Sequence, residues 1–268
     1  MPYSGVNGQR LYYEVGGDGD PIVLLHGFLG NADLMEAPAT GLGSGFRAIR
    51  IDRRLCGRSE GPPGPVSLAD EVADLTALLD WFGIDATHLV AHDEGAEVAI
   101  EFALTRPERT RSMALLAPSL DGFDPWLKEF AAQPQLVAAI HADPVFGALG
   151  KWLASPVFDV ARAREGMQER LTEIFRRSRA GVDRFIRPPR TGPAQAERLG
   201  AIEARTAVIV GGRDLPGRLQ TAQTIAAGIA GCEMITFPEL SRFLHIEESR
   251  AVMRRMTDFF LPEPEIER

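Results

Sequence analysis

The chain has 268 residues, of which 45% are hydrophobic and 25% charged, and its formal net charge is -8 at pH 7. This composition is typical of a folded protein and excludes a disordered chain. The acidic balance argues against nucleic acid or an anionic membrane as a partner. The length fits one α/β domain that carries an insertion.

The two cysteines, Cys56 and Cys232, lie far apart and show no metal-ligand spacing. They favour free thiols in a reducing compartment and give no indication of a metal site. The polar N-terminal segment lacks the apolar run of a signal peptide, and no run approaches the length of a membrane span. We therefore expect a soluble, cytoplasmic protein; its oligomeric state is not predicted.

Short apolar runs alternate with helical patterns along the chain. Many of these runs are rich in valine and isoleucine, which is typical of buried strands in a parallel sheet. The first run alternates polar and apolar residues, as an edge strand does. The expected strands are residues 9–15, 21–27, 46–52, 87–93, 112–118, 206–212 and 232–238.

The clearest helical pattern covers residues 67–83. Ser67, followed three residues later by Asp70, forms a capping-box variant, and Gly83 is a typical helix end. The alternation of strands and helices predicts a mostly parallel, doubly wound sheet with helices on both faces. Further helices are expected at residues 95–105, 217–230 and 247–260.

The segment LVAHDEGAEVAI, residues 89–100, places Asp93 where an apolar strand meets a helix. The small residues Ala91 and Gly95 stand two positions before and after it. This is the outline of a G-x-S-x-G nucleophile elbow with a carboxylate in place of the serine. A helix N-terminus favours a carboxylate. Asp93 is therefore either a functional group at an elbow or a simple N-cap.

Four other segments appear in a familiar order: LLHGFLG before the elbow, then RIDRRLCGRSEGP, and after it GGRDLP and FPELSRFLHIEESRAV. Together with the elbow they resemble the α/β-hydrolase superfamily over nearly the whole chain. The resemblance implies an α/β-hydrolase fold and an enzyme that acts on a small-molecule substrate without a cofactor. Fold alone does not determine the reaction.

Within this superfamily, an aspartate nucleophile marks haloalkane dehalogenases and epoxide hydrolases, and Asp93 resembles theirs. In that branch the carboxylate attacks carbon, and a water activated by histidine cleaves the resulting ester. The resemblance also implies that Asp214 is the acid of the site. The N–H groups of Phe28 and Glu94 would then form the oxyanion hole.

The segment that carries the catalytic histidine in relatives has Arg242 at that position. A guanidinium cannot take up a proton at neutral pH. We expect Arg242 to pair with Asp93 and Asp214 and to lower the pKa of Asp93. His245 either packs at the start of the last helix, or replaces the missing base if a helical turn brings it within reach.

Residues 119–204 show helical patterns and no strand pattern. They are expected to form a helical cap inserted between two parts of the α/β core, 1–118 and 205–268. Apolar side chains of the cap would line a pocket over Asp93; the candidates are Trp126, Leu127, Phe130, Phe146 and Trp152.

Two further departures concern the substrate. Epoxide hydrolases hold the epoxide oxygen with cap tyrosines, but all three tyrosines here lie before residue 14. Many dehalogenases bind the departing halide with a tryptophan at the position of Glu94, whose carboxylate would repel it.

We therefore expect a hydrolase-family enzyme that acts on a small, mostly apolar molecule through Asp93, by epoxide-hydrolase-like or related hydrolysis. Two alternatives remain. One is a lyase, isomerase or cyclase in which Asp93 transfers a proton. The other is an inactive ligand-binding module that contains an Asp93–Arg242–Asp214 ion cluster.

Overall fold

The computed structural model describes residues 2–62, 64–123, 125, 153–178, 188 and 192–261. Each of the seven predicted strands is present, with ends that differ from the prediction by at most two residues. The strands are β1 (Tyr3–Val6), β2 (Gln9–Gly16), β3 (Asp20–Leu25), β4 (Phe46–Ile51), β5 (Thr87–His92), β6 (Thr110–Leu116), β7 (Arg205–Gly211) and β8 (Glu233–Phe237).

The strands form one sheet in the order β1-β2-β4-β3-β5-β6-β7-β8. β2 pairs antiparallel with β1 and β4, and the other neighbouring strands are parallel. β1 was not predicted, because its sequence YSGV has no apolar run. The expected α/β-hydrolase fold, with a mostly parallel sheet, is confirmed.

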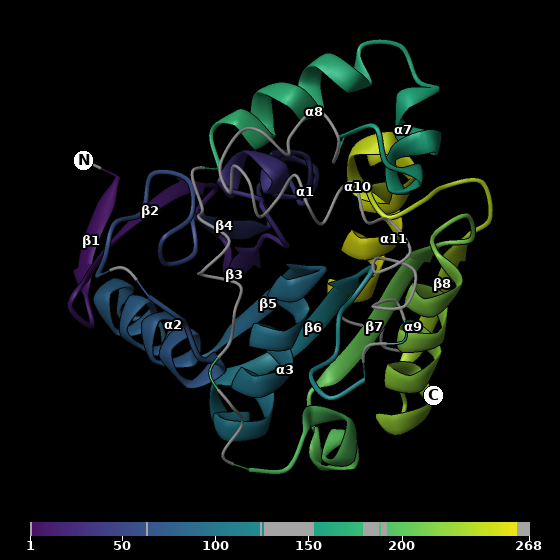
Figure 1. The fold of residues 1–268 in the computed structure, drawn as a ribbon. Coiled ribbons are helices and arrows are strands. Elements are labelled where there is room, and N and C mark those ends of the chain that lie inside the picture. Colours follow the sequence, from purple (N-terminus) through teal and green to yellow (C-terminus); the bar gives the residue numbers. More distant parts are fainter. Residues whose placement is uncertain are drawn as a thin grey trace.

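Helices cover both faces of this sheet (Figure 1). The longer ones are α2 (Leu68–Phe82), α3 (Glu94–Thr105), α8 (Met167–Arg176), α9 (Pro216–Gly228) and α11 (Ser249–Phe260). The short ones are η1 (Ala32–Met35), α1 (Glu36–Gly41), η2 (Pro107–Arg109), η3 (Pro156–Phe158), α7 (Asp159–Arg162), η5 (Gln195–Glu197), η6 (Leu199–Ala201) and α10 (Leu244–Glu247).

The predicted ends of α2 are confirmed by their hydrogen bonds. The Ser67 hydroxyl accepts a bond from the Asp70 N–H at 3.1 Å, and the Asp70 carboxylate accepts one from the Ser67 N–H at 3.0 Å. This is the reciprocal pattern of a capping box. Gly83 ends the helix with a φ of +64°, in the left-handed region that glycine adopts without strain.

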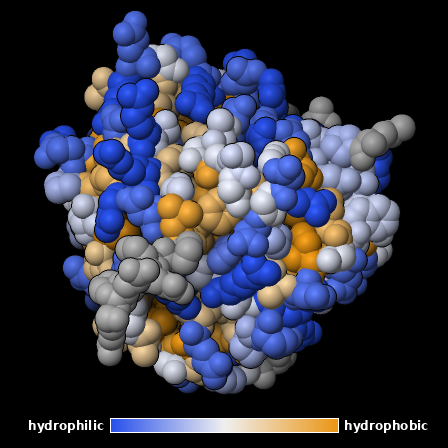
Figure 2. Space-filling model, turned by 180° about the vertical axis from the view of Figure 1, so that it is seen from behind, coloured by the Kyte–Doolittle hydropathy of each residue, from blue (hydrophilic) through white to orange (hydrophobic). Residues whose placement is uncertain are grey.

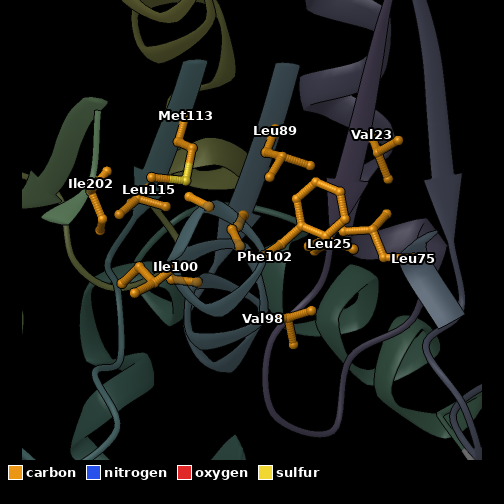
Figure 3. Packing of buried hydrophobic residues seen from close by; sticks show 14 of the residues in the cluster. Val23, Leu25, Leu75, Leu89, Val98, Ile100, Phe102, Met113, Leu115 and Ile202 are labelled. Carbon is orange, nitrogen blue, oxygen red and sulfur yellow. The ribbon is translucent and has the colours of Figure 1, made fainter. Parts of the chain in front are cut away.

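One hydrophobic cluster lies on each face of the sheet. On the face covered by α2, α3 and α9, Leu89 of β5 packs with Phe102 and Leu75 (Figure 3). On the opposite face, Val90 of β5 packs in a cluster that includes Met256 of α11. Successive side chains of a strand point to opposite faces, so β5 is anchored on both sides. The position of Asp93, directly after β5, is fixed by this packing.

The described residues 153–178 of the insertion contain η3, α7 and α8 and no strand, in agreement with the helical pattern. Their buried side chains form a third cluster together with Phe243 and Leu34. Further along, Leu199 and Ile202 belong to the core cluster around β5. The limits of the cap stay a prediction. Five expected pocket residues lie outside the described residues: Trp126, Leu127, Phe130, Phe146 and Trp152.

Polar and charged residues cover most of the face shown in Figure 2, with apolar residues in small groups between them. In the described part of the chain, the exposed large apolar side chains are Val15, Trp81, Met234 and Leu261. None of the helices described is both long and apolar enough for a membrane span.

The contact between α3 and β3 leads to a testable prediction about Gly95. A Cβ atom at Gly95 would lie 2.5 Å from the Leu25 carbonyl oxygen and 2.7 Å from that of His26. Backbone cannot move away as a side chain can, so Gly95→Ala is expected to lower the free energy of unfolding by about 1–3 kcal/mol. Denaturant unfolding measures this change.

Gly200→Ala is the matched control, because the nearest atom to its new Cβ is 3.9 Å away. It is expected to change the unfolding free energy by less than about 1 kcal/mol. Equal losses in the two variants would show that the close approach at Gly95 does not limit packing.

Candidate active site

Asp93 forms a sharp turn between β5 and α3. Its φ of 53° and ψ of -121° are rare for a residue other than glycine. The Asp93 N–H donates to the Leu116 carbonyl at 3.0 Å, and the Asp93 carbonyl accepts bonds from Ala96 N–H and Ser119 N–H at 2.9 and 3.1 Å. A strained backbone of this kind costs about 1–3 kcal/mol and persists only where its surroundings hold it. The elbow geometry is therefore present.

Two residues that contact the elbow, Gly27 and Gly95, have no space for a side chain. A Cβ at Gly27 would lie 2.5 Å from the Asp93 Cβ, and Gly95 has the close contacts with β3 described above. The loop after β3 therefore lies directly against the Asp93 side chain.

The Asp93 carboxylate is only 1% exposed and accepts bonds at both oxygens. Oδ2 accepts the Phe28 N–H at 3.0 Å and contacts the Arg242 guanidinium. Oδ1 accepts the Ser119 hydroxyl at 2.9 Å and lies 2.9 Å from Nη1 of Arg218. The Ser119 oxygen in turn accepts a bond from Arg218. One carboxylate is thus surrounded by four donors, two of them positively charged.

This surrounding determines the charge of Asp93. Burial alone would raise its pKa, but the charges of Arg242 and Arg218 outweigh burial and hold the pKa well below its usual value. Asp93 is therefore an anion throughout the neutral range.

His92 supports this arrangement from the strand side. Its Nε2 lies 3.1 Å from the Arg242 carbonyl oxygen, so Nε2 carries the proton and donates it. Burial lowers the pKa of His92 to about 4, which keeps the ring neutral at pH 7. His92 therefore fixes the backbone of Arg242 while the Arg242 side chain contacts Asp93.

His245 does not occupy the position of a general base. It lies within α10, is fully buried, and contacts the His92 ring with the two ring centroids 4.5 Å apart. Within the described residues, no hydrogen bond or ion pair joins it to Asp93. Burial and the neighbouring His92 lower the pKa of His245 well below its usual value. The structure thus places Arg242, rather than His245, against Asp93.

Asp214 lies in the loop between β7 and α9. Its Oδ1 accepts the Leu215 N–H at 2.7 Å, while its buried Oδ2 has no hydrogen-bond partner among the described residues. Burial raises its pKa to about 6, against the lowering effect of Arg242 and Arg218. The expected ion pair between Asp214 and Arg242 is not formed in the described part of the chain. Arg218, which was not predicted from the sequence, instead joins Arg242 as a second cation on Asp93.

Glu94 belongs to a neighbouring ion cluster. Its carboxylate lies 3.5 Å from Nη2 of Arg53, which also pairs with Glu71 at 3.1 Å. The Arg53 N–H donates to Nε2 of His26 at 3.0 Å, and His26 Nδ1 lies 2.9 Å from the Gly27 carbonyl. Through His26 and Gly27, this ion cluster contacts the start of the loop that carries Phe28. The Glu94 N–H as an oxyanion donor stays a prediction.

Three residues of the site were missed from the sequence. Arg218 shares a face of α9 with the buried Ala222 and Ile225, so helical periodicity would have placed it inward. Ser119 follows the end of β6, at the sheet edge where Asp93 lies. His92, directly before Asp93, was not selected either, because its partner is a backbone carbonyl 150 residues further along the chain. Among the described residues, no group of histidine, cysteine or acidic side chains is arranged to bind a metal ion.

Comparison with known proteins supports the fold. Residues 20–247 match the family model described as alpha/beta hydrolase fold. A 2-hydroxy-6-oxononadienedioate/2-hydroxy-6-oxononatrienedioate hydrolase from Klebsiella pneumoniae is 27% identical, with 93% of this chain and 90% of the relative covered. The protein of the same name from Burkholderia vietnamiensis is 30% identical over 76% of this chain and 74% of its own. A hydrolase structure from Pseudomonas aeruginosa has 25% identity and a TM-score of 0.79, covering 97% of this chain and 98% of that one.

The charge balance around Asp93 predicts a large effect of Asp93→Asn. The substitution keeps the shape of the side chain but leaves two buried guanidinium groups without their shared anion. Breaking a buried pair in this way typically costs about 3–5 kcal/mol, and we expect a loss of that size in the free energy of unfolding. The exposed pair of Asp159 and Arg162 provides the control. Asp159→Asn should lower the free energy of unfolding by less than about 1 kcal/mol. Similar losses in both variants would contradict the role of Asp93 as the anion that both buried arginines share.

Asp214→Asn is predicted to stabilise the protein in a pH-dependent manner. Burial raises the pKa of Asp214 to about 6 in the folded protein from its ordinary value of 3.8, so the folded state binds the proton more tightly. The wild type accordingly loses stability as pH rises from about 4 through 6, by roughly 3 kcal/mol. The Asn variant should not show that loss. Unfolding at pH 4 and pH 8 measures the difference, and a wild-type advantage at pH 8 would disprove the raised pKa.

Proposed function

Since the chain belongs to the α/β-hydrolase-fold family, we propose that it hydrolyses a small, mostly apolar molecule by attack of Asp93 on carbon. The observation that carries this proposal is the ionised Asp93 carboxylate at a strained elbow, with the Phe28 N–H on Oδ2. The two curated relatives described above are named as hydrolases, which supports hydrolysis as the reaction class. The proposal includes a lid formed by the insertion at 119–204.

The low pKa of Asp93 distinguishes between the two catalytic roles. A general base works best with a pKa near the working pH, and a carboxylate held far below that value is a weak base. A carbon nucleophile has to be ionised at the working pH, which a low pKa ensures, although a less basic carboxylate also attacks more slowly. The pKa direction therefore favours attack on carbon over proton transfer in a lyase, isomerase or cyclase.

The first step is a displacement. An oxygen of Asp93 forms a bond to the substrate carbon, and the bond from that carbon to an epoxide oxygen or a halogen breaks with its electron pair. Arg242 and Arg218, which contact Asp93, would stabilise the negative charge that develops. The epoxide oxygen then takes up a proton from water, or the halide departs as an anion. The product of this step is an ester of Asp93.

The second step needs a group that takes a proton from water as the water attacks the ester carbonyl. His245 has no bond to Asp93, so the usual histidine is missing. Asp214 has a pKa of about 6, and its Oδ2 has no hydrogen-bond partner in the described part of the chain. We propose that Asp214 takes this proton from the attacking water. The carbonyl carbon of Asp93 then keeps the water oxygen, and the product oxygen takes the proton back from Asp214 and leaves as an alcohol. The regenerated Asp93 carboxyl releases its proton to solvent.

A second candidate function is ligand binding without chemistry. It is favoured by the engagement of both Asp93 oxygens with arginines, which reduces their reactivity. In this case the ion cluster is structural.

We predict a covalent adduct on Asp93. After incubation with a panel of epoxides and alkyl halides, intact-mass analysis should show one adduct, which peptide mapping assigns to the segment around Asp93. Without a histidine base the second step should be slower by a factor of about 10² to 10⁴ than the general-base step of a complete site. Asp214→Asn should lengthen the lifetime of the adduct, and its breakdown in wild type should accelerate as pH rises through about 6.

Asp93→Asn is the negative control, and labelling that persists in it comes from other carboxylates. Turnover in ¹⁸O-labelled water should introduce the label into the Asp93 carboxylate. Rapid turnover without that label would exclude the ester mechanism. Ligand binding with no adduct from any electrophile would favour the binding function.

A further inference from the structure

The loop between β3 and η1, residues 26–31, carries Phe28, whose N–H donates to Asp93. We call it the Phe28 loop. Leu29, the next residue, has a φ of +51°, which lies in the left-handed region that residues with a side chain rarely adopt. Such a conformation costs about 1–3 kcal/mol and must be held by its surroundings. The Phe28 N–H therefore depends on whatever holds Leu29.

A backbone bond from the Gly30 N–H to the Gly27 carbonyl at 3.1 Å closes the turn around Leu29, and a second group that holds it comes from the insertion. The hydroxyl of Ser178, just after α8, donates a hydrogen bond to the Leu29 carbonyl oxygen. Ser178 is itself fixed by its backbone, since its carbonyl accepts the Gly57 N–H at 2.6 Å. It is 3% exposed, so water does not readily replace this bond.

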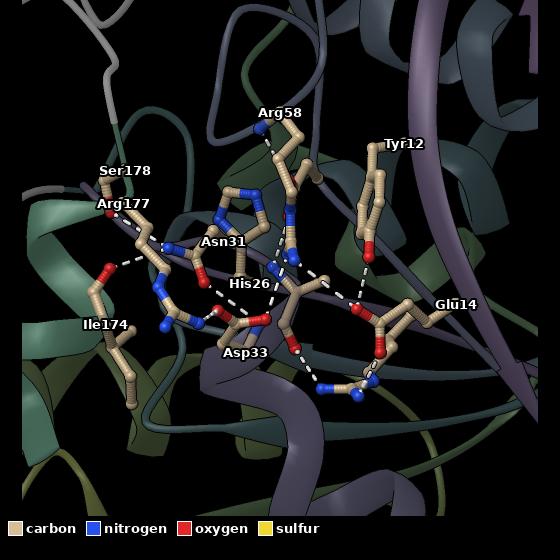
Figure 4. Close-up of polar contacts among 12 residues, drawn as sticks. Tyr12, Glu14, His26, Asn31, Asp33, Arg58, Ile174, Arg177 and Ser178 are labelled. Carbon is tan, nitrogen blue, oxygen red and sulfur yellow. Dashed lines mark hydrogen bonds and ion pairs between the residues drawn. The ribbon is translucent and has the colours of Figure 1, made fainter. Parts of the chain in front are cut away.

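A second set of contacts ties the end of α8 to the same loop. Nδ2 of Asn31 donates to the Ile174 carbonyl at 2.7 Å, while Oδ1 of Asn31 caps η1 by accepting the Asp33 N–H at 2.9 Å. Arg177 also pairs with Asp33 at 3.1 Å. Figure 4 shows Asn31 and Asp33 facing Ile174, Arg177 and Ser178 across this junction.

The insertion also packs against the segment that carries Arg242. Phe243, the residue after Arg242, stacks on Phe158 of η3 with ring centroids 4.7 Å apart, and it contacts Phe175 of α8 edge-on. Phe28 and Leu29 pack against this cluster. One apolar cluster of the insertion thus contacts the residues next to both donors of Asp93 Oδ2.

We propose that Ser178 is a positioning residue, which holds the Phe28 loop in its strained conformation so that the Phe28 N–H points at Asp93. This inference deepens the proposed function and rests on it where catalysis is concerned. Removal of the hydroxyl leaves the Leu29 carbonyl without its donor, and the loop then relaxes away from Asp93.

The test uses Ser178→Ala in the full chain with ¹⁵N-labelled phenylalanine. The Phe28 amide signal, identified by its absence in Phe28→Leu, reports directly on the bond to Asp93. It should shift or broaden in Ser178→Ala and return toward its wild-type position in Ser178→Thr, which keeps the hydroxyl. The rate of adduct formation or breakdown at Asp93 should fall by about 10- to 100-fold, as expected for a misplaced catalytic donor.

The matched control is Ser155→Ala. Ser155 is also buried in the insertion, but its hydroxyl has no hydrogen-bond partner among the described residues. Its loss should leave the Phe28 signal and the adduct rate unchanged. Asn31→Asp removes the bond to Ile174 and keeps the cap on η1, so it should shift the Phe28 signal even if Ser178→Ala does not fold.

The outcomes separate this inference from the proposed function. A Phe28 signal that is unchanged in both Ser178→Ala and Asn31→Asp overturns the positioning role. A shifted signal combined with no adduct in any protein supports the positioning role and refutes attack by Asp93. A shifted signal with an adduct rate equal to that of wild type overturns the link between Ser178 and catalysis.

Discussion

The pairing of Asp93 with two arginines in a buried, strained turn is the interaction on which the rest of the site depends. A carboxylate at this depth would take up a proton if it stood alone. Arg218 and Arg242 prevent this, and they come from α9 and from the loop before α10, so one anion joins three separate segments at the edge of the sheet. The strained backbone of Asp93 is tolerated because β5, which is packed on both faces, fixes the position of the turn that follows it.

The same depth explains the role of the groups around the pair. His92 is neutral and donates a hydrogen bond to the Arg242 carbonyl, so it fixes the Arg242 backbone without adding a charge to the site. Ser119 links the two residues because its hydroxyl donates to Asp93 and accepts a bond from Arg218. Both oxygens of the carboxylate are thus held by donors from separate segments. Such a site favours a single arrangement over a flexible one, which fits a chemistry that needs the carboxylate oriented rather than free.

Much of the fold was predictable from the sequence, because buried strands correspond to local apolar runs. The capping box of α2 likewise depends on two residues close in sequence, Ser67 and Asp70. The strand β1 was not, since YSGV is ordered by its bonds to β2 rather than by its own pattern. In the site, Asp93 and Arg242 were found through their motifs. Arg218 and Ser178 stand in no motif, and their roles arise from how α9 and α8 are rotated and docked, which no short segment encodes.

The balance of buried charge also constrains how this site can change by mutation. Above a pH of about 6, the two carboxylates of Asp93 and Asp214 match the two guanidinium groups of Arg218 and Arg242. Loss of Asp93, or of either arginine that it contacts, leaves a buried charge without its partner, so a serine at position 93 would be tolerated only together with the loss of an arginine. The effects of substitutions at Asp93, Arg218 and Arg242 are therefore expected to be strongly non-additive, and a change at one of the three positions limits which residues the other two can become.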